Sequence, residues 1–135
     1  MEPPFHPSIR VQPAPEWTVL SEGVSARHMV EGNGCSITLY RLGEGCRFER
    51  HEHPFPELGV VLVGRGLLKV GPEERELGAG DSFYIPGRVP HGFDCGGTGP
   101  VIMLNVTAPV PAEVDGPSAS ELLRIARKAA GKLPA

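Results

Sequence analysis

Short apolar runs separated by Gly and Pro dominate the middle of the chain, and they constrain the fold more than any other feature. Between Trp17 and Val106, runs such as SITLYRL (36–42), SFYIP (82–86) and VIMLNV (101–106) are each followed by turn residues. The 18 Gly and 15 Pro among 135 residues favour frequent turns, and hence many short strands rather than a helical bundle. The sequence therefore predicts an all-β barrel or sandwich.

One run carries two specific expectations. ELGVVLVG (57–64) is apolar at consecutive positions, which is typical of a strand covered on both faces. Gly64-Arg65 separates it from GLLKV (66–70), and we interpret this dipeptide as a tight hairpin turn.

The two ends of the chain differ from the middle. Residues 1–16 contain five prolines and can form neither a helix nor a central strand, so we expect an extended arm over the surface or across a partner subunit. In residues 111–135, Ser118 and Glu121 have capping-box spacing. The residues that then share one helical face are Leu122, Leu123, Ile125, Ala126 and Ala129. We therefore predict an arm (1–16), a barrel (17–110), and a linker with a C-terminal helix that closes the barrel (111–135).

Composition narrows the possible partners and the compartment. The net charge is -3 without a Lys/Arg cluster, so we expect no nucleic-acid partner and no anionic membrane surface. The longest apolar run is too short to cross a bilayer, and MEPPFHPSIR lacks the pattern of a signal peptide. Cys35, Cys46 and Cys95 are odd in number and form no CxxC pair, which favours thiols in a reducing cytoplasm over a disulfide or a zinc–cysteine site.

The segment HEHPFPE (51–57) is the candidate functional site. In a strand, His51 and His53 project from the same face, and Glu57 opens the next strand after a Pro-Phe-Pro break. Two neutral imidazoles and a carboxylate on one face form a site for a divalent transition metal, and His91, after the turn GRVP, offers a third imidazole.

The alternative is a set of surface histidines. We favour it for His6 and His28, but it fits His51 and His53 poorly. The apolar run after Glu57 directs this segment toward the core, where an unpaired carboxylate is costly.

The chain resembles a single-domain cupin. The first cupin motif, G(X)5HXH(X)3-4E(X)6G, is met by Gly45, His51, His53, Glu57 and Gly64. The second, G(X)5PXG(X)2H(X)3N, is met by Gly80, Pro86 and His91. It has two departures: the motif glycine is displaced to Gly87, which leaves Arg88 in its place, and Cys95 stands at the asparagine position.

The resemblance implies a double-stranded β-helix (jelly-roll) cupin barrel that holds one metal. The ligands it implies are His51, His53, Glu57 and His91, the same set that the spacing suggests. The resemblance does not identify the metal, which could be Fe, Mn, Ni, Co, Cu or Zn. We interpret Cys95 as a small core residue rather than a thiol near the site, and Asp81 as a turn residue rather than a ligand.

Further residues are candidates for the cavity lining. They are Tyr40, Arg41, Arg47, Phe55, Phe83, Tyr84, Phe93, Met103 and Asn105. Arg47 shares strand parity with both motif-1 histidines, so it is the best candidate to meet an anionic substrate, although a solvated surface arginine is the simpler interpretation.

Two classes of function compete. The first is a metal-dependent enzyme, dioxygenase-like or an isomerase or lyase, that acts on a small oxygenated molecule and uses Glu57 as a general base. The second is a non-catalytic barrel that binds a small ligand and holds a structural metal. The arm and the exposed edges of a jelly roll, together with the resemblance, also predict a homodimer.

Overall fold

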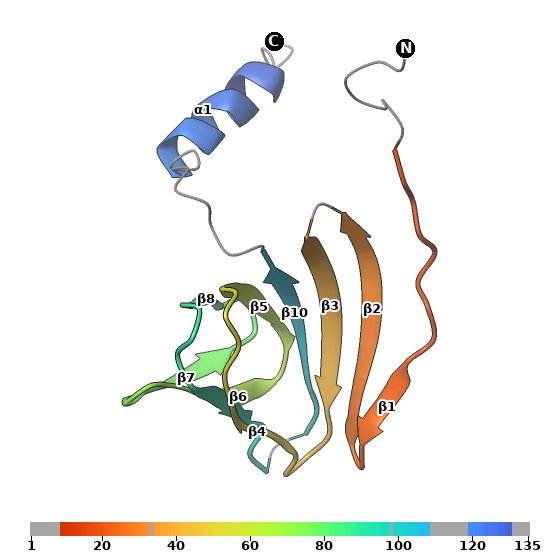
Figure 1. Cartoon of the computed structure of the whole chain (residues 1–135), viewed down its shortest axis with the longest axis vertical. Coiled ribbons are helices and arrows are strands. Elements are labelled where there is room, and N and C mark those ends of the chain that lie inside the picture. The colour runs from red at the N-terminus through yellow and green to blue at the C-terminus, as the bar shows by residue number, and fades with distance from the viewer. Residues whose placement is uncertain (1–8, 33, 98, 109–118, 131–135) are drawn as a thin grey trace.

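The computed structural model describes residues 9–32, 34–97, 99–108 and 119–130. These form ten strands and one helix (Figure 1). The strands are β1 (Thr18–Ser21), β2 (Val24–Gly32), β3 (Cys35–Leu42), β4 (Arg47–His51), β5 (Glu57–Val63), β6 (Arg65–Val70), β7 (Glu73–Gly78), β8 (Ser82–Ile85), β9 (His91–Asp94) and β10 (Val101–Thr107), and the helix is α1 (Ala119–Ala130).

The strands form two antiparallel sheets that enclose one core. The first has the order β1-β2-β3-β10-β5-β8, and the second has the order β4-β9-β6-β7. Buried side chains from both sheets fill the space between them; they are Val24, Leu42, Val61, Leu68, Leu77, Ile85, Phe93, Cys95, Val101 and Met103. This two-sheet jelly roll with one C-terminal helix confirms the predicted fold class.

The predicted hairpin at Gly64-Arg65 is wrong. β5 pairs with β10 and β8, whereas β6 pairs with β7 and β9, so the chain crosses from one sheet to the other at this point. Gly64 has φ 86°, and a Cβ there would lie 2.3 Å from the Pro100 carbonyl oxygen. A glycine is needed at this corner because the backbone is left-handed and passes close to a neighbouring strand.

β5 is also less covered than its apolar sequence predicted. Its inward residues alternate with outward ones, and outward Leu58 and Leu62 are 49% and 46% exposed. Together with Tyr84 of β8, they leave hydrophobic side chains on the outer side of the six-stranded sheet. The prediction that this strand is covered on both faces is therefore wrong.

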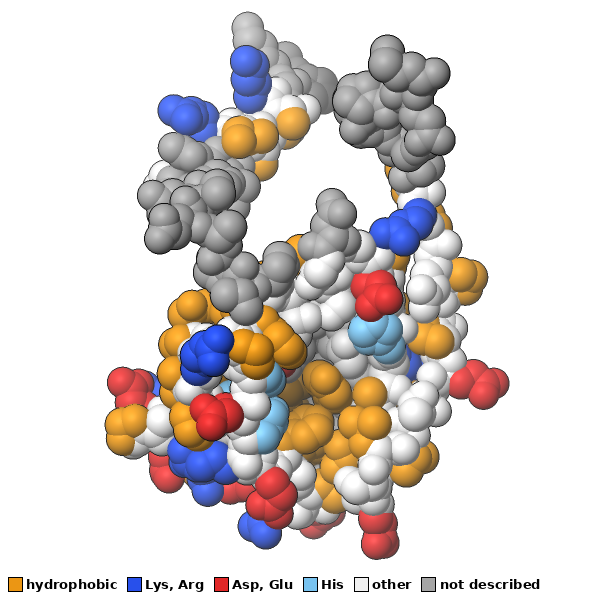
Figure 2. Space-filling view, in the orientation of Figure 1, with side chains coloured by type: hydrophobic (Ala, Val, Ile, Leu, Met, Phe, Trp, Pro, Cys, Tyr) orange, Lys and Arg blue, Asp and Glu red, His pale blue; other side chains and the backbone are white. Residues whose placement is uncertain are grey.

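The helix forms as predicted, but it does not close the barrel. Leu123 and Ile125 are 57% and 59% exposed, so the described part of the apolar stripe of α1 lies open to solvent, as Figure 2 shows. The proposed cap residue Ser118 lies outside the described residues. In the described ranges, no helix is long and apolar enough to cross a membrane.

The described part of the arm lies along β2. The Arg10 guanidinium donates a hydrogen bond to the Glu31 carbonyl (2.7 Å), and the Gln12 amide donates one to the His28 carbonyl (3.3 Å). Ile9 and Val11 remain 90% and 83% exposed. Residues 9–16 are therefore held at the surface of their own barrel by polar contacts, with their apolar side chains uncovered.

Candidate metal centre

Three histidines converge on one side of the barrel: His51 is exposed, His53 is partly buried and His91 is buried. β4 ends at His51, which lies opposite His91 of β9 in the strand register, and His53 follows in the turn before β5. The ring centroids of His51 and His53 lie 4.4 and 4.8 Å from that of His91. One ligand atom from each of the three imidazoles lies within 4.8 Å of the others. The three imidazoles are therefore close enough together to form a candidate metal centre.

Backbone carbonyls fix the tautomer of all three rings. Nδ1 of His51 lies 2.8 Å from the Glu49 oxygen, Nδ1 of His53 lies 2.7 Å from the Phe55 oxygen, and Nδ1 of His91 lies 2.9 Å from the Val89 oxygen. A carbonyl can only accept, so each Nδ1 carries the hydrogen and donates it. In the neutral ring, each Nε2 then keeps a free lone pair, as a metal-ligating histidine requires.

His91 is the buried member of the group. It is 4% exposed, and its Nε2 has no hydrogen-bond partner among the described residues. Burial lowers the pKa of His91 below its ordinary value of 6.5, and the neighbouring imidazoles of His51 and His53 lower it further. The hydrogen bond to Val89 and the charge of Glu57 oppose this shift. The ring is therefore neutral at neutral pH, with an orphaned acceptor that a cation could satisfy.

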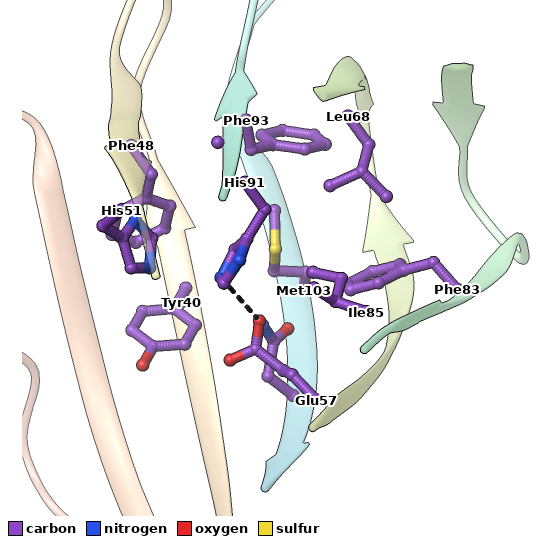
Figure 3. A pocket seen from close by; sticks show the side chains of 12 residues that line it. Tyr40, Phe48, His51, Glu57, Leu68, Phe83, Ile85, His91, Phe93 and Met103 are labelled. Carbon is purple, nitrogen blue, oxygen red and sulfur yellow. Dashed lines mark ion pairs between the residues drawn. The ribbon is translucent and has the colours of Figure 1, made fainter. Parts of the chain in front are cut away.

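Glu57 brings a carboxylate to the same place. It opens β5, its side chain is 12% exposed, and its Oε2 lies 3.9 Å from the His91 Nε2 (Figure 3). This distance is too long for a hydrogen bond. Nearby Tyr40 has its pKa raised, first by burial and then by the charge of Glu57, so its phenol stays protonated and acts only as a neutral polar group.

The site opens into a small cavity of about 60 Å³ between the two sheets (Figure 3). Its lining includes the predicted residues Tyr40, His51, Glu57, Phe83, His91, Phe93, Met103 and Asn105. Sequence reasoning missed Phe48, Leu68, Ile85 and Gly92. Arg41, Arg47, Phe55 and Tyr84 were candidates but do not line it. Phe55 instead stacks on the His53 ring, with centroids 4.1 Å apart.

The structure supports the simpler interpretation of Arg47, a solvated surface arginine. The alternative, that it meets a substrate in the cavity, is wrong because of an irregularity in β4. The register between β4 and β9 shifts between Phe48 and His51, so parity does not carry through the strand. Phe48 therefore faces the cavity, and Arg47 is exposed and pairs with Glu49 at 3.0 Å. Phe48 is the one apolar residue of the segment RFERH, and this hydrophobicity could have identified it as the inward-facing residue.

The two departures from the second motif now have structural explanations. Arg88 has φ 65° and is the one non-glycine residue of the described ranges with a positive φ, the backbone conformation that glycine adopts most easily. Its N–H donates to the His53 carbonyl at 2.7 Å, which ties this turn to the first motif. Cys95 is fully buried in the core and its thiol faces the Gly99 carbonyl at 3.2 Å, so it is a core residue as predicted.

His28 was expected at the surface, and this is confirmed. It is exposed, lies 3.0 Å from the carboxylate of Glu31, and does not line the cavity. Asp81 accepts a hydrogen bond from the Gly78 N–H at 2.8 Å, as expected of a turn residue. His6 lies outside the described residues.

Comparisons with known proteins agree with this architecture. The model of the family "Cupin domain" (Cupin_2) matches residues 38–107. Dimethylsulfoniopropionate lyase DddW of Ruegeria pomeroyi is 33% identical over 85 residues, which cover 62% of this chain and 52% of that protein. The chain thus spans about half the length of this curated relative.

Two solved structures illustrate the shared fold. Rru_A2000 of Rhodospirillum rubrum, a cupin-2 domain, has a TM-score of 0.66 and 19% identity over 92% of this chain and 90% of its own. TT1209 of Thermus thermophilus has a TM-score of 0.62 and 28% identity over 67% and 87% of the two chains.

Proposed function

The chain belongs to the cupin domain family, and from this membership and its converging imidazoles we propose that it is a metal-dependent enzyme acting on a small oxygenated molecule. The proposed ligands are His51, His53, His91 and Glu57, around one divalent ion from the series Fe, Mn, Ni, Co, Cu and Zn. One observation carries the proposal: three imidazoles have their Nδ1 atoms tied to carbonyls and their Nε2 atoms free.

Glu57 supplies the proposed proton transfer. When bound, the ion would polarise a substrate carboxylate or carbonyl and so acidify the adjacent C–H bond. The Glu57 carboxylate lies at the same end of the cavity, mostly buried and without a hydrogen bond to His91. A carboxylate that loosens from the ion could accept the proton as a general base.

Among the possible reactions, we favour a lyase. The curated relative DddW is named as a lyase of dimethylsulfoniopropionate. This compound has a carboxylate and, on its β-carbon, a dimethylsulfonium leaving group. In such an elimination, Glu57 takes the proton from the carbon beside the carboxylate. The electron pair of that C–H bond forms the C=C bond, and the leaving group departs with the pair of its own bond. No external oxidant is required. Dioxygenase chemistry, which consumes O2, is the second candidate, because a glutamate beside three histidines resembles that pattern.

The proposal is tested with protein loaded in turn with each of the six metals. Dimethylsulfoniopropionate, small hydroxy acids, diketones and keto acids are offered with and without O2, and oxygen uptake is recorded. A lyase releases an unsaturated acid equally well without O2, and in D2O it exchanges the α-proton in a Glu57-dependent way. If no compound turns over with any of the metals, but one of the compounds raises the melting temperature, the chain is a binding module and the proposal is wrong.

A further inference from the structure

Asn105 carries a buried acceptor that the proposed metal does not use. It lies on β10, lines the cavity and is 6% exposed. Its Oδ1 has no hydrogen-bond partner among the described residues. Leaving a buried carbonyl oxygen without a donor is unfavourable, and native proteins rarely do so without a ligand or an ordered water. The contents of the cavity must therefore supply the donor.

The position of Asn105 separates it from the histidines. It pairs with Thr38 of β3 and Gly59 of β5, so on the inner face its diagonal neighbours are Tyr40 and Glu57. His51 and His91 come from β4 and β9 of the other sheet. The amide therefore faces the cavity from the wall that also carries Glu57, across from His51 and His91 of the other sheet. There it can contact a group of the ligand beside the one that reaches the metal.

The rest of the lining limits what that ligand can be. No Lys or Arg of the described residues lines the cavity, so a second anionic group would have no counterion there. The remaining walls are largely apolar, with the rings of Phe48, Phe83 and Phe93 among them. A volume of about 60 Å³ holds roughly four to six waters, or a ligand of a few non-hydrogen atoms.

We propose that Asn105 determines substrate specificity: its Oδ1 accepts a hydrogen bond from the hydroxyl group of a small monoanionic hydroxy acid whose carboxylate reaches the metal. This inference rests on the proposed function and names its substrate class. A dimethylsulfonium group has neither an O–H nor an N–H, so it would leave Oδ1 unpartnered. The preferred substrate therefore differs from the one in the name of the curated relative.

The test compares two probes that differ in the hydroxyl hydrogen. Lactate and 2-methoxypropanoate share a carboxylate and an adjacent oxygen, but only lactate can donate a hydrogen bond. Their dissociation constants are measured from the visible spectrum of the Co(II)-loaded full chain, for wild type and for Asn105→Leu. Met103→Leu, on the same strand and in the same cavity, is the control for altered packing.

We expect wild type to bind lactate more tightly than the ether, and Asn105→Leu to reduce that preference by roughly 5- to 10-fold, the effect of one hydrogen bond. Met103→Leu keeps the preference. Ligand-free Asn105→Leu should melt higher than wild type, because an unpartnered acceptor is gone. If the leucine variant does not fold, the probe preference and the melting temperature are measured on Asn105→Val, for which we expect the same changes.

Three outcomes overturn the inference alone, and a fourth overturns the proposed function together with it. An unchanged probe preference with a lower melting temperature means that Asn105 is structural. An unchanged preference with an unchanged melting temperature means that water satisfies the amide. If wild type holds Co(II) but binds neither probe, the substrate class is wrong while the metal site stands. If the chain holds no Co(II), the proposed function itself fails.

Discussion

Replacing Gly59 with alanine should displace the Phe83 ring into the cavity. Gly59 faces inward from β5, opposite Phe83 of β8 in the register. A Cβ at Gly59 would lie 2.2 Å from Cζ of Phe83, with two further ring atoms within 2.8 Å. The Phe83 ring lies directly over the glycine and forms part of the cavity wall, so it must move when a methyl group is added.

The size of the effect follows from where the ring can go. To restore ordinary van der Waals contact at 3.4 Å or more, the ring must retreat by more than 1 Å. Overpacking a core costs about 1–3 kcal/mol. The adjoining cavity of about 60 Å³ can receive the ring, so we expect the lower part of that range, about 1–2 kcal/mol of unfolding free energy. The same movement fills the cavity and should weaken ligand binding while the metal is retained.

Urea unfolding of the metal-free protein measures this change. The matched control is Gly97→Ala, because a Cβ there meets nothing within 4 Å and the backbone is not left-handed. The control should stay within about 0.5 kcal/mol of wild type. Adding Phe83→Leu, which removes the clashing ring edge, should make the double variant less destabilised than the sum of its parts by about 1 kcal/mol. A Gly59→Ala variant as stable as the control, or strictly additive effects, would refute this reasoning.

Three further predictions follow from the same site and surface. Glu57→Gln should keep part of the metal but lose most turnover, whereas His91→Ala should lose both; equal turnover in Glu57→Gln and wild type would exclude the general-base role. The metal-free protein should lose stability as pH falls through about 6.5, because the unfolded chain then takes up a proton that buried His91 resists. Metal content should fall in the same pH range. A urea midpoint that stays constant from pH 8 to 5 in wild type would contradict this. The chain should form a homodimer, since Ile9, Val11, Leu58 and Leu123 are all exposed apolar side chains on the arm, the outer sheet face and α1; light scattering that gives a monomer, unchanged on deletion of residues 1–16, would oppose it.

The convergence of the histidines could be predicted because it depends on short covalent spacing and on a turn. The intervals among His51, His53 and Glu57 leave the chain little freedom, and His91 lies across from His51 once β4 and β9 pair. Tyr40, Met103 and Asn105 were among the candidates for the cavity lining, and all three line it.

What failed depended on long-range geometry that alternation cannot encode. The irregularity in β4 places Phe48 at the cavity instead of Arg47, which was a candidate because it shares parity with His51 and His53. The change of sheet at Gly64 depends on the partners of β5 and β6, which lie elsewhere in the chain. Hydrophobicity alone could not distinguish an outer sheet face that is covered from one that is open, as Leu58 and Leu62 illustrate.

Elemental analysis of the full chain, purified without added metal or chelator, tests the central claim most directly. We predict about one divalent transition metal per chain in wild type, and loss of that metal in a His51→Ala, His53→Ala double variant that still folds by circular dichroism. The His28→Ala variant, which alters a surface histidine, serves as the control and should retain full metal content. Full metal content in the double variant would contradict the account, and so would a metal-free wild-type protein that stays metal-free after incubation with each of the six ions.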